Sequence, residues 1–152
     1  MSSLYLENDA STLEFAARVA RSCNPPLVVH LRGDLGTGKT TFARGFIRAL
    51  GYTGQVKSPT FSLQESYVLE HARIFHFDLY RIHDPRELEF IGIRDVADGA
   101  DTICLIEWPE RGEGAIPKAD IEFAFEHAGP GRRVDSNFRS SQGHSITTKC
   151  KT

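Results

Sequence analysis

The sequence predicts a single α/β domain with a mixed, mostly parallel central sheet flanked by helices. Strand and helix patterns intermix along the chain, which is typical of layered α/β domains. The 152 residues are enough for one domain with a substantial core. The composition, 40% hydrophobic and 25% charged, is close to the average of soluble globular proteins.

The first third of the chain predicts a helix, a strand and a second helix. Ser11 starts a Ser-x-x-Glu capping box, and the helix that follows is ended by the Asn-Pro-Pro at residues 24–26. The short apolar run "LVVHL", residues 27–31, predicts a buried strand. From Lys39 onward apolar residues recur at helical spacing, and Gly51 occupies the C-terminal capping position.

The rest of the chain predicts more strands. Residues 61–69 and 73–80 are β-rich runs separated by three residues, so we expect an antiparallel hairpin and a mixed sheet. "DPRE", residues 84–87, has the N-cap, proline and glutamate that open a short helix. "TICLIE", residues 102–107, predicts another buried strand, and the alternating "DIEFAFE", residues 120–126, predicts a half-exposed strand at or near an edge.

Charge divides the chain unevenly. The net charge is -2, but residues 129–152 hold five Lys or Arg against one Asp, which leaves the first 128 residues at about -6. Such an acidic body is not expected to bind nucleic acid directly. Because its end is poor in apolar residues, we expect a domain of residues 1–133 and a polar, basic, flexible tail of residues 134–152.

Several classes of protein are disfavoured. The three cysteines form no CxxC pair, so the sequence indicates neither a disulfide framework nor a zinc site. Apolar runs are only a few residues long, and the first residues lack the pattern of a signal peptide. We therefore expect a cytoplasmic protein without a membrane partner.

A phosphate-binding loop lies between the predicted strand and the second helix. Gly33-x4-Gly38-Lys39-Thr40 fits the P-loop pattern, which requires this strand-loop-helix context. Glycine allows backbone N–H groups to turn toward an anion, and the helix N-terminus adds its positive dipole end. Lys39 can reach the β and γ phosphates, and the Thr40 hydroxyl can ligate Mg²⁺. The loop residues expected to bind nucleotide are Gly33, Leu35, Gly36, Thr37, Gly38, Lys39, Thr40 and Thr41.

The sequence therefore predicts a P-loop NTPase-like domain with ATP and Mg²⁺ as cofactors. An Asn-Lys-x-Asp guanine motif is absent, so ATP is favoured over GTP, and an ABC signature is also absent. Two acids follow apolar strands, as metal-binding or water-orienting carboxylates do in such enzymes: Asp78 and Glu107. Lys39, Asp78 and Glu107 are the predicted catalytic residues, and Thr40, Asp78 and Glu107 the predicted metal site. Either acid could instead be a solvated strand terminus.

Five segments together indicate a family. "GDLGTGKTTFARGF", "VKSPTFSLQESY", "HFDLYRI", "ELEFIGIRD" and "LIEWPERG", in this order and spacing, resemble the bacterial TsaE (YjeE) family over residues 27–127. The resemblance implies an ATPase that acts as a nucleotide-driven switch on a complex of TsaB and TsaD. Those partners modify the tRNA adenosine beside the anticodon, so tRNA would be contacted only indirectly. Hydrolysis would be weak alone and stimulated by the partners.

The resemblance also implies roles for particular residues. Glu107 matches the family's Mg²⁺ carboxylate, Asp78 an acid that contacts metal-bound or catalytic water, and Thr60 of "SPTF" a γ-phosphate sensor. Trp108 would lie beside the nucleotide, as would Arg132, or alternatively Arg133. By the same resemblance, residues 9–11 would lie beside the adenine base of the nucleotide. "RDVADGAD" lacks the family's aromatic pair, and the tail from Val134 onward has no family-like pattern.

Two other functions remain open at this stage. A small-molecule kinase needs an arginine-rich lid, and no such segment lies between the P-loop helix and Glu107. A nucleotide-binding module without turnover would not need the two carboxylates. His30 and His76 fall inside apolar strands, where we expect core histidines rather than ligands.

Overall fold

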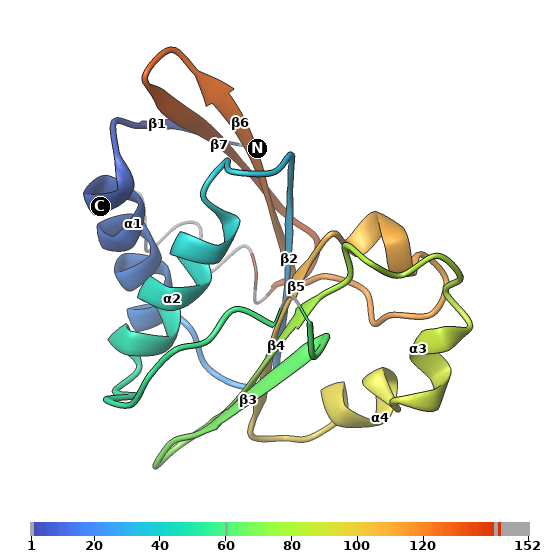
Figure 1. Cartoon of the computed structure of the whole chain (residues 1–152). Helices are drawn as coiled ribbons and strands as arrows, with labels where there is room; N and C mark the ends of the chain where they lie inside the picture. The colour runs from blue at the N-terminus through green and yellow to red at the C-terminus, as the bar shows by residue number, and fades with distance from the viewer. Residues whose placement is uncertain (1, 60, 142, 144–152) are drawn as a thin grey trace.

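The computed structural model of the chain describes residues 2–59, 61–141 and 143. Within them, seven strands form one sheet in the order β1-β7-β6-β2-β5-β4-β3 (Figure 1). The four central strands run parallel to one another. They are β6 (Ile121–Ala128), β2 (Leu27–Gly33), β5 (Thr102–Glu107) and β4 (Arg73–Asp78). The prediction of an α/β domain with a mixed sheet is confirmed.

Antiparallel strands complete the sheet on both sides. β3 (Gln64–Val68) pairs with β4 as the predicted hairpin. On the other side, β7 (Gly131–Phe138) pairs with β6, and β1 (Ser2–Leu6) pairs with β7. The prediction that the strand beginning near residue 120 lies at or near an edge is wrong, because β7 and β1 both lie outside it. The sequence patterns of β1 and β7 are weak, because hydrogen bonds to neighbouring strands stabilise them more than burial of their own apolar side chains does.

The tail predicted for residues 134–152 does not include residues 134–138. Residues 134–138 belong to β7, where Val134 is buried beneath the helices. Two ordered neighbouring strands satisfy the backbone of this polar segment, which composition alone could not indicate. Residues 142 and 144–152 lie outside the described residues.

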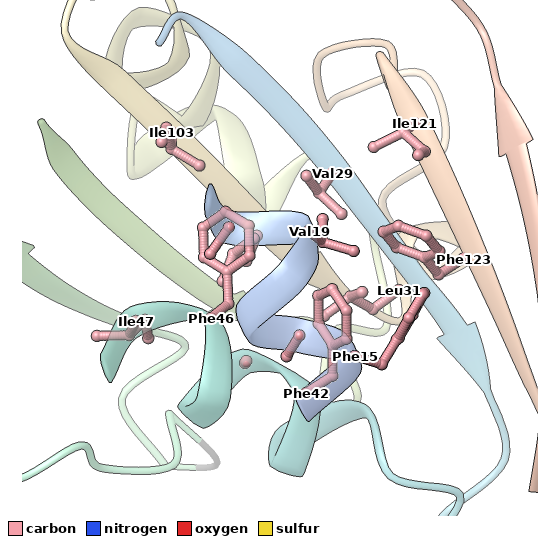
Figure 2. Close-up of a cluster of buried hydrophobic side chains, with 14 of the residues drawn as sticks. Phe15, Val19, Val29, Leu31, Phe42, Phe46, Ile47, Ile103, Ile121 and Phe123 are labelled. Carbon is pink, nitrogen blue, oxygen red and sulfur yellow. The ribbon is translucent and has the colours of Figure 1, made fainter. Parts of the chain in front are cut away.

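One face of the sheet is covered by α1 (Asp9–Arg21) and α2 (Lys39–Ala49), as Figure 1 shows. Beneath them lies an aromatic core, drawn in Figure 2, in which the ring centroids of Phe42 and Phe123 are 5.1 Å apart. A Cβ on Gly45 would lie 3.0 Å from that of Ala16, so glycine permits the close approach of the two helices.

The first helix begins earlier than predicted. Asn8, not Ser11, is the N-cap, and its side chain accepts a hydrogen bond from the Ser11 backbone N–H at 2.9 Å. β1 ends at Leu6, so the chain turns into the helix immediately after it. Gly51 lies past the end of α2 with φ 108°, as predicted.

The opposite face carries short helices and a second, smaller core. α3 (Glu87–Phe90), α4 (Ile93–Ala97) and the 3₁₀ turn η1 (Pro109–Gly112) lie on this side. Their buried residues, such as Leu88 and Ile93, pack with Phe77 and Ile106 of the sheet. Among the described residues, no helix combines the length and the apolar character needed to cross a bilayer.

Candidate nucleotide-binding site

The glycine-rich loop connects β2 directly to α2. Gly33, Gly36 and Gly38 have φ angles of 144°, 74° and 108°, in a region that residues with a Cβ rarely adopt. A Cβ on Gly33 would lie 2.6 Å from the backbone oxygen of Phe125. Backbone conformation therefore favours glycine at all three positions, and close packing also requires it at Gly33. Thr37 is buried and its hydroxyl donates to the backbone oxygen of Asp34 at 2.7 Å, so it shapes the loop from within.

Lys39 lies at the first position of α2 with its side chain almost fully buried. Its ammonium group donates to the backbone oxygen of Gly33 and lies 3.8 Å from the ring centroid of Trp108. Burial lowers the pKa of Lys39, while the nearby charges of Glu107 and Asp78 act in the opposite direction. The loop thus holds a desolvated ammonium group, which interacts more strongly with an anion than an exposed one does.

Glu107 ends β5 and meets the start of α2. The hydroxyl of Thr40 donates to its carboxylate, with distances of 3.1 Å to Oε1 and 3.3 Å to Oε2. On the other side, Nε2 of His76 lies 2.6 Å from Oε2. Glu107 is only 2% exposed, so its alternative assignment as a solvated strand terminus does not hold.

Asp78 ends β4 and lies directly opposite Glu107 in the parallel register. Its carboxylate accepts a hydrogen bond from the Tyr80 N–H at 3.1 Å. Burial, and then repulsion from Glu107, raise the pKa of Asp78, while that hydrogen bond, His76 and Lys39 oppose the rise. The two carboxylates meet because both strands run parallel and end at the same edge of the sheet, where ligands bind in open α/β sheets.

These groups surround a hollow of about 390 Å³ at the carboxyl edge of the sheet. Most of the predicted residues line it: Leu35, Gly36, Gly38, Lys39, Thr40, Thr41, Asp78, Glu107 and Trp108. Gly33 and Thr37 lie behind it and shape the loop. Thr60, the predicted γ-phosphate sensor, lies outside the described residues.

The structure distinguishes the two candidate arginines. Nη1 of Arg132 donates to Asp9 at 2.8 Å and to Thr12 at 3.0 Å, and a Cβ on Gly38 would lie 3.0 Å from it. Arg133 pairs instead with Glu126. Arg132 therefore lies against the end of the loop without lining the hollow, which places it beside the site.

Sequence reasoning missed Tyr80 and Arg81 and gave only partial indications for Asp9 and His76. Tyr80 and Arg81 line the hollow, and the Tyr80 ring lies 5.0 Å from that of Trp108. Asp9, suggested only as part of a segment passing the base, also lines it. His76 was assigned to the core, yet it contacts Glu107. Strand alternation was the available signal for His76, since residues 76 and 78 lie on the same face of β4.

The donors suit a hard divalent cation. Hydroxyl and carboxylate oxygens of Thr40, Asp78 and Glu107 are the ligand types that Mg²⁺ prefers. Over the described part of the chain, no group of three or more His, Cys, Asp or Glu residues could form a complete metal cage. Mg²⁺ instead takes one or two carboxylates and completes its shell with phosphate oxygens and water, so the residues present fit it.

Comparisons with known proteins settle the family. Residues 6–134 match the family model for "Threonylcarbamoyl adenosine biosynthesis protein TsaE". The chain belongs to the TsaE family. It is 42% identical over 147 residues to the "tRNA threonylcarbamoyladenosine biosynthesis protein TsaE" of Haemophilus influenzae, covering 93% of this chain and 92% of the relative. The protein of that name from Bacillus subtilis is 36% identical over 126 residues, covering 83% and 78% of the two chains.

A solved TsaE-like structure has the same fold. The crystal structure of Bacillus subtilis YdiB aligns with a TM-score of 0.84 and 26% identity, over 99% of this chain and 93% of that chain. The resemblance inferred from the five segments is confirmed. TsaE membership and the strand-loop-helix geometry together identify a P-loop nucleotide-binding protein.

Proposed function

We propose that this protein binds and hydrolyses ATP with Mg²⁺ in the cytoplasm, as the switch subunit of tRNA threonylcarbamoyladenosine biosynthesis. The observation that carries the proposal is the meeting of Thr40, Asp78 and Glu107 beside Lys39 at the mouth of the glycine-rich loop. A protein that only bound nucleotide would not need two desolvated carboxylates there, because each costs folding free energy.

Each group has a part that its position supports. The loop amides and the Lys39 ammonium would hold the phosphates and neutralise charge that develops on them. Thr40 and Glu107 would hold Mg²⁺, which supplies electrostatic stabilisation of the transferring phosphoryl group. Asp78 would orient the attacking water or a metal-bound water. Trp108 covers Lys39 and would exclude bulk water from the phosphates.

A link between the site and the neighbouring loop supports a switch. The Asp78 N–H donates to the Leu63 oxygen at 3.0 Å, and the Leu63 N–H donates to the Pro59 oxygen at 2.9 Å. The segment that contains Pro59 is therefore linked to the backbone of Asp78, the residue proposed to orient the attacking water. A change at the γ-phosphate would reach this segment through backbone hydrogen bonds, and partner proteins would sense it there.

The proposal is tested in two steps. Purified protein is first titrated with ATP at fixed Mg²⁺, using Trp108, the only tryptophan of the chain, as a fluorescent reporter. Hydrolysis is then measured alone and with TsaB and TsaD, and association is measured with ATP, ADP or no nucleotide. We expect slow hydrolysis alone, stimulation by the partners and nucleotide-dependent association. Absence of ATP binding would contradict the whole proposal, whereas absence of stimulation and association would contradict the partner role.

A further inference from the structure

One buried side chain at the site has no place in the mechanism above. His76 lies in β4, two residues before Asp78, and is 1% exposed. Its Nε2 lies 2.6 Å from Oε2 of Glu107, which is shorter than an ordinary N–H···O hydrogen bond. Within the described residues, the Glu107 carboxylate takes its hydrogen bonds from two side chains, Thr40 and His76.

A purely structural role explains this contact poorly. His76 lies on the sheet face that carries Ile74 and Leu105, both fully buried, where an apolar side chain would be the stable choice. In addition, Nδ1 of His76 is buried and has no hydrogen-bond partner among the described residues. The ring therefore carries an unsatisfied polar atom, a cost that only its other nitrogen offsets.

The Glu107 carboxylate is contacted by Thr40 at both oxygens and by His76 at Oε2 alone. An ionised carboxylate only accepts hydrogen bonds, so a contact with Glu107 in that form requires the His76 tautomer that carries a proton on Nε2. The Thr40 hydroxyl is closer to Oε1, at 3.1 Å, than to Oε2, at 3.3 Å. His76 thus fixes Oε2, and this sets the orientation of the whole carboxylate toward Thr40 at the start of α2.

We infer that His76 is a positioning residue that orients the Glu107 carboxylate toward Thr40 and thereby toward a nucleotide-bound Mg²⁺. The inference rests on the proposed function. Partners that hold a metal-ligating carboxylate in place commonly account for about 10–100-fold in metal affinity or activity. The His76 donor should contribute an effect of this size without contacting nucleotide.

Two substitutions of His76 distinguish the effect of its hydrogen-bond donor from the effect of the shape of its ring. In His76→Gln the side-chain amide nitrogen is placed near Nε2 of the histidine, whereas the shorter side chain in His76→Asn cannot reach Glu107. His30→Asn is the matched control, because His30 is also a strand histidine, 7% exposed, with Nε2 3.0 Å from the oxygen of Pro117. Thermal melts establish that each variant is folded.

The measurements are ATP affinity as a function of Mg²⁺ concentration, by Trp108 fluorescence, and kcat and KM separately. For His76→Asn we expect the half-saturating Mg²⁺ concentration to rise and kcat to fall, each by about 10–100-fold. ATP affinity in the presence of a chelator should be unchanged. His76→Gln should retain most of the Mg²⁺ affinity and kcat that His76→Asn loses, and His30→Asn should behave as the wild type.

Three results would overturn the inference. They are wild-type Mg²⁺ dependence in His76→Asn, equal defects in a folded His76→Gln, and loss of the folded state in His76→Asn, which would mean that the role is structural. If the wild-type protein itself binds no ATP, the proposed function fails. If the wild type binds ATP with Mg²⁺ and His76→Asn matches it, only the role of His76 fails.

Discussion

The first residue of α2 and the body of the helix lie in opposite environments. Along its length Phe42 and Phe46 pack into an aromatic core with Phe15 and Phe123, where each ring is buried among apolar neighbours. At its first residue Lys39 is also buried but lies near two carboxylates, Asp78 and Glu107. Burial stabilises the fold in the first region and opposes it in the second, because desolvation favours apolar groups and penalises charged ones.

The buried charged groups at the start of α2 are not explained by their contribution to stability. An apolar substitute for a buried charge often keeps or increases stability, so stability alone does not select these groups. Burial lowers the pKa of Lys39 and raises the pKa of Asp78, in each case the direction that disfavours the charged form. Such shifts gather at functional sites. Substitutions in the aromatic core should therefore lower stability. Substitutions of the charged groups should maintain or increase stability and impair ATP binding or hydrolysis.

The largest expected effect is on the core. Phe42→Ala should lower the free energy of unfolding by about 3–5 kcal/mol, because it removes a fully buried ring and leaves a cavity. Chemical denaturation measures this change. Phe90→Ala is the control, since Phe90 is 91% exposed and its loss should change stability by no more than about 0.5 kcal/mol. Equal losses in both variants would contradict the assignment of the core.

Next in size is the effect of Glu107→Gln on turnover. Removing this charge should lower kcat by roughly 10²–10³-fold, while ATP affinity changes much less, since lost electrostatic stabilisation acts mainly on the transition state. A steady-state ATPase assay with the partners present measures it. Glu122→Gln, which alters a carboxylate 2.9 Å from Arg32, should retain wild-type turnover. Wild-type rates in Glu107→Gln would refute the assignment.

Lys39→Met should separate affinity from stability. Loss of the charged donor should weaken ATP binding by about 1.5–3 kcal/mol, whereas the free energy of unfolding should not fall, because a desolvated ammonium group is removed. Calorimetric titration and denaturation measure the two quantities. In Lys118→Met, where the lysine is exposed, both should stay at wild-type values. Unchanged affinity in Lys39→Met would count against phosphate binding by this residue.

The smallest effect concerns Asp78 and pH. Its folded-state pKa is raised above the ordinary value of 3.8, so above that raised pKa the charged carboxylate destabilises the fold. Asp78→Asn should therefore increase stability near neutral pH by about 1 kcal/mol, or roughly 2–4 °C in Tm. The gain should decline as pH falls through the raised pKa and disappear below the unfolded-state value.

Thermal melts from neutral to acidic pH, with Asp98→Asn as an exposed control, test this sign. A gain that grew on acidification would contradict the shift. The same substitution should also slow ATP hydrolysis, so stability and activity would change in opposite directions at a single position.

Local patterns predicted the elements that carry their own signal. The P-loop, the strand that ends at Glu107 and the hairpin before Asp78 all appear where apolar runs and glycine spacing placed them. β1 and β7 were not recognised, and the short N-terminal strand and Asn8 displaced the predicted start of the first helix. β1 and β7 are stabilised by strands that are distant in the sequence, and local propensity carries no information about such pairing.

The sequence alone determined the phosphate loop, because the backbone conformations it requires are accessible only to glycine at those positions, and it determined which acids follow buried strands. Only the tertiary structure decided that Asp78 and Glu107 lie opposite each other, that Arg132 rather than Arg133 lies against the loop, and that His76 holds Glu107. These relations depend on strand order and register, and long-range pairing sets both.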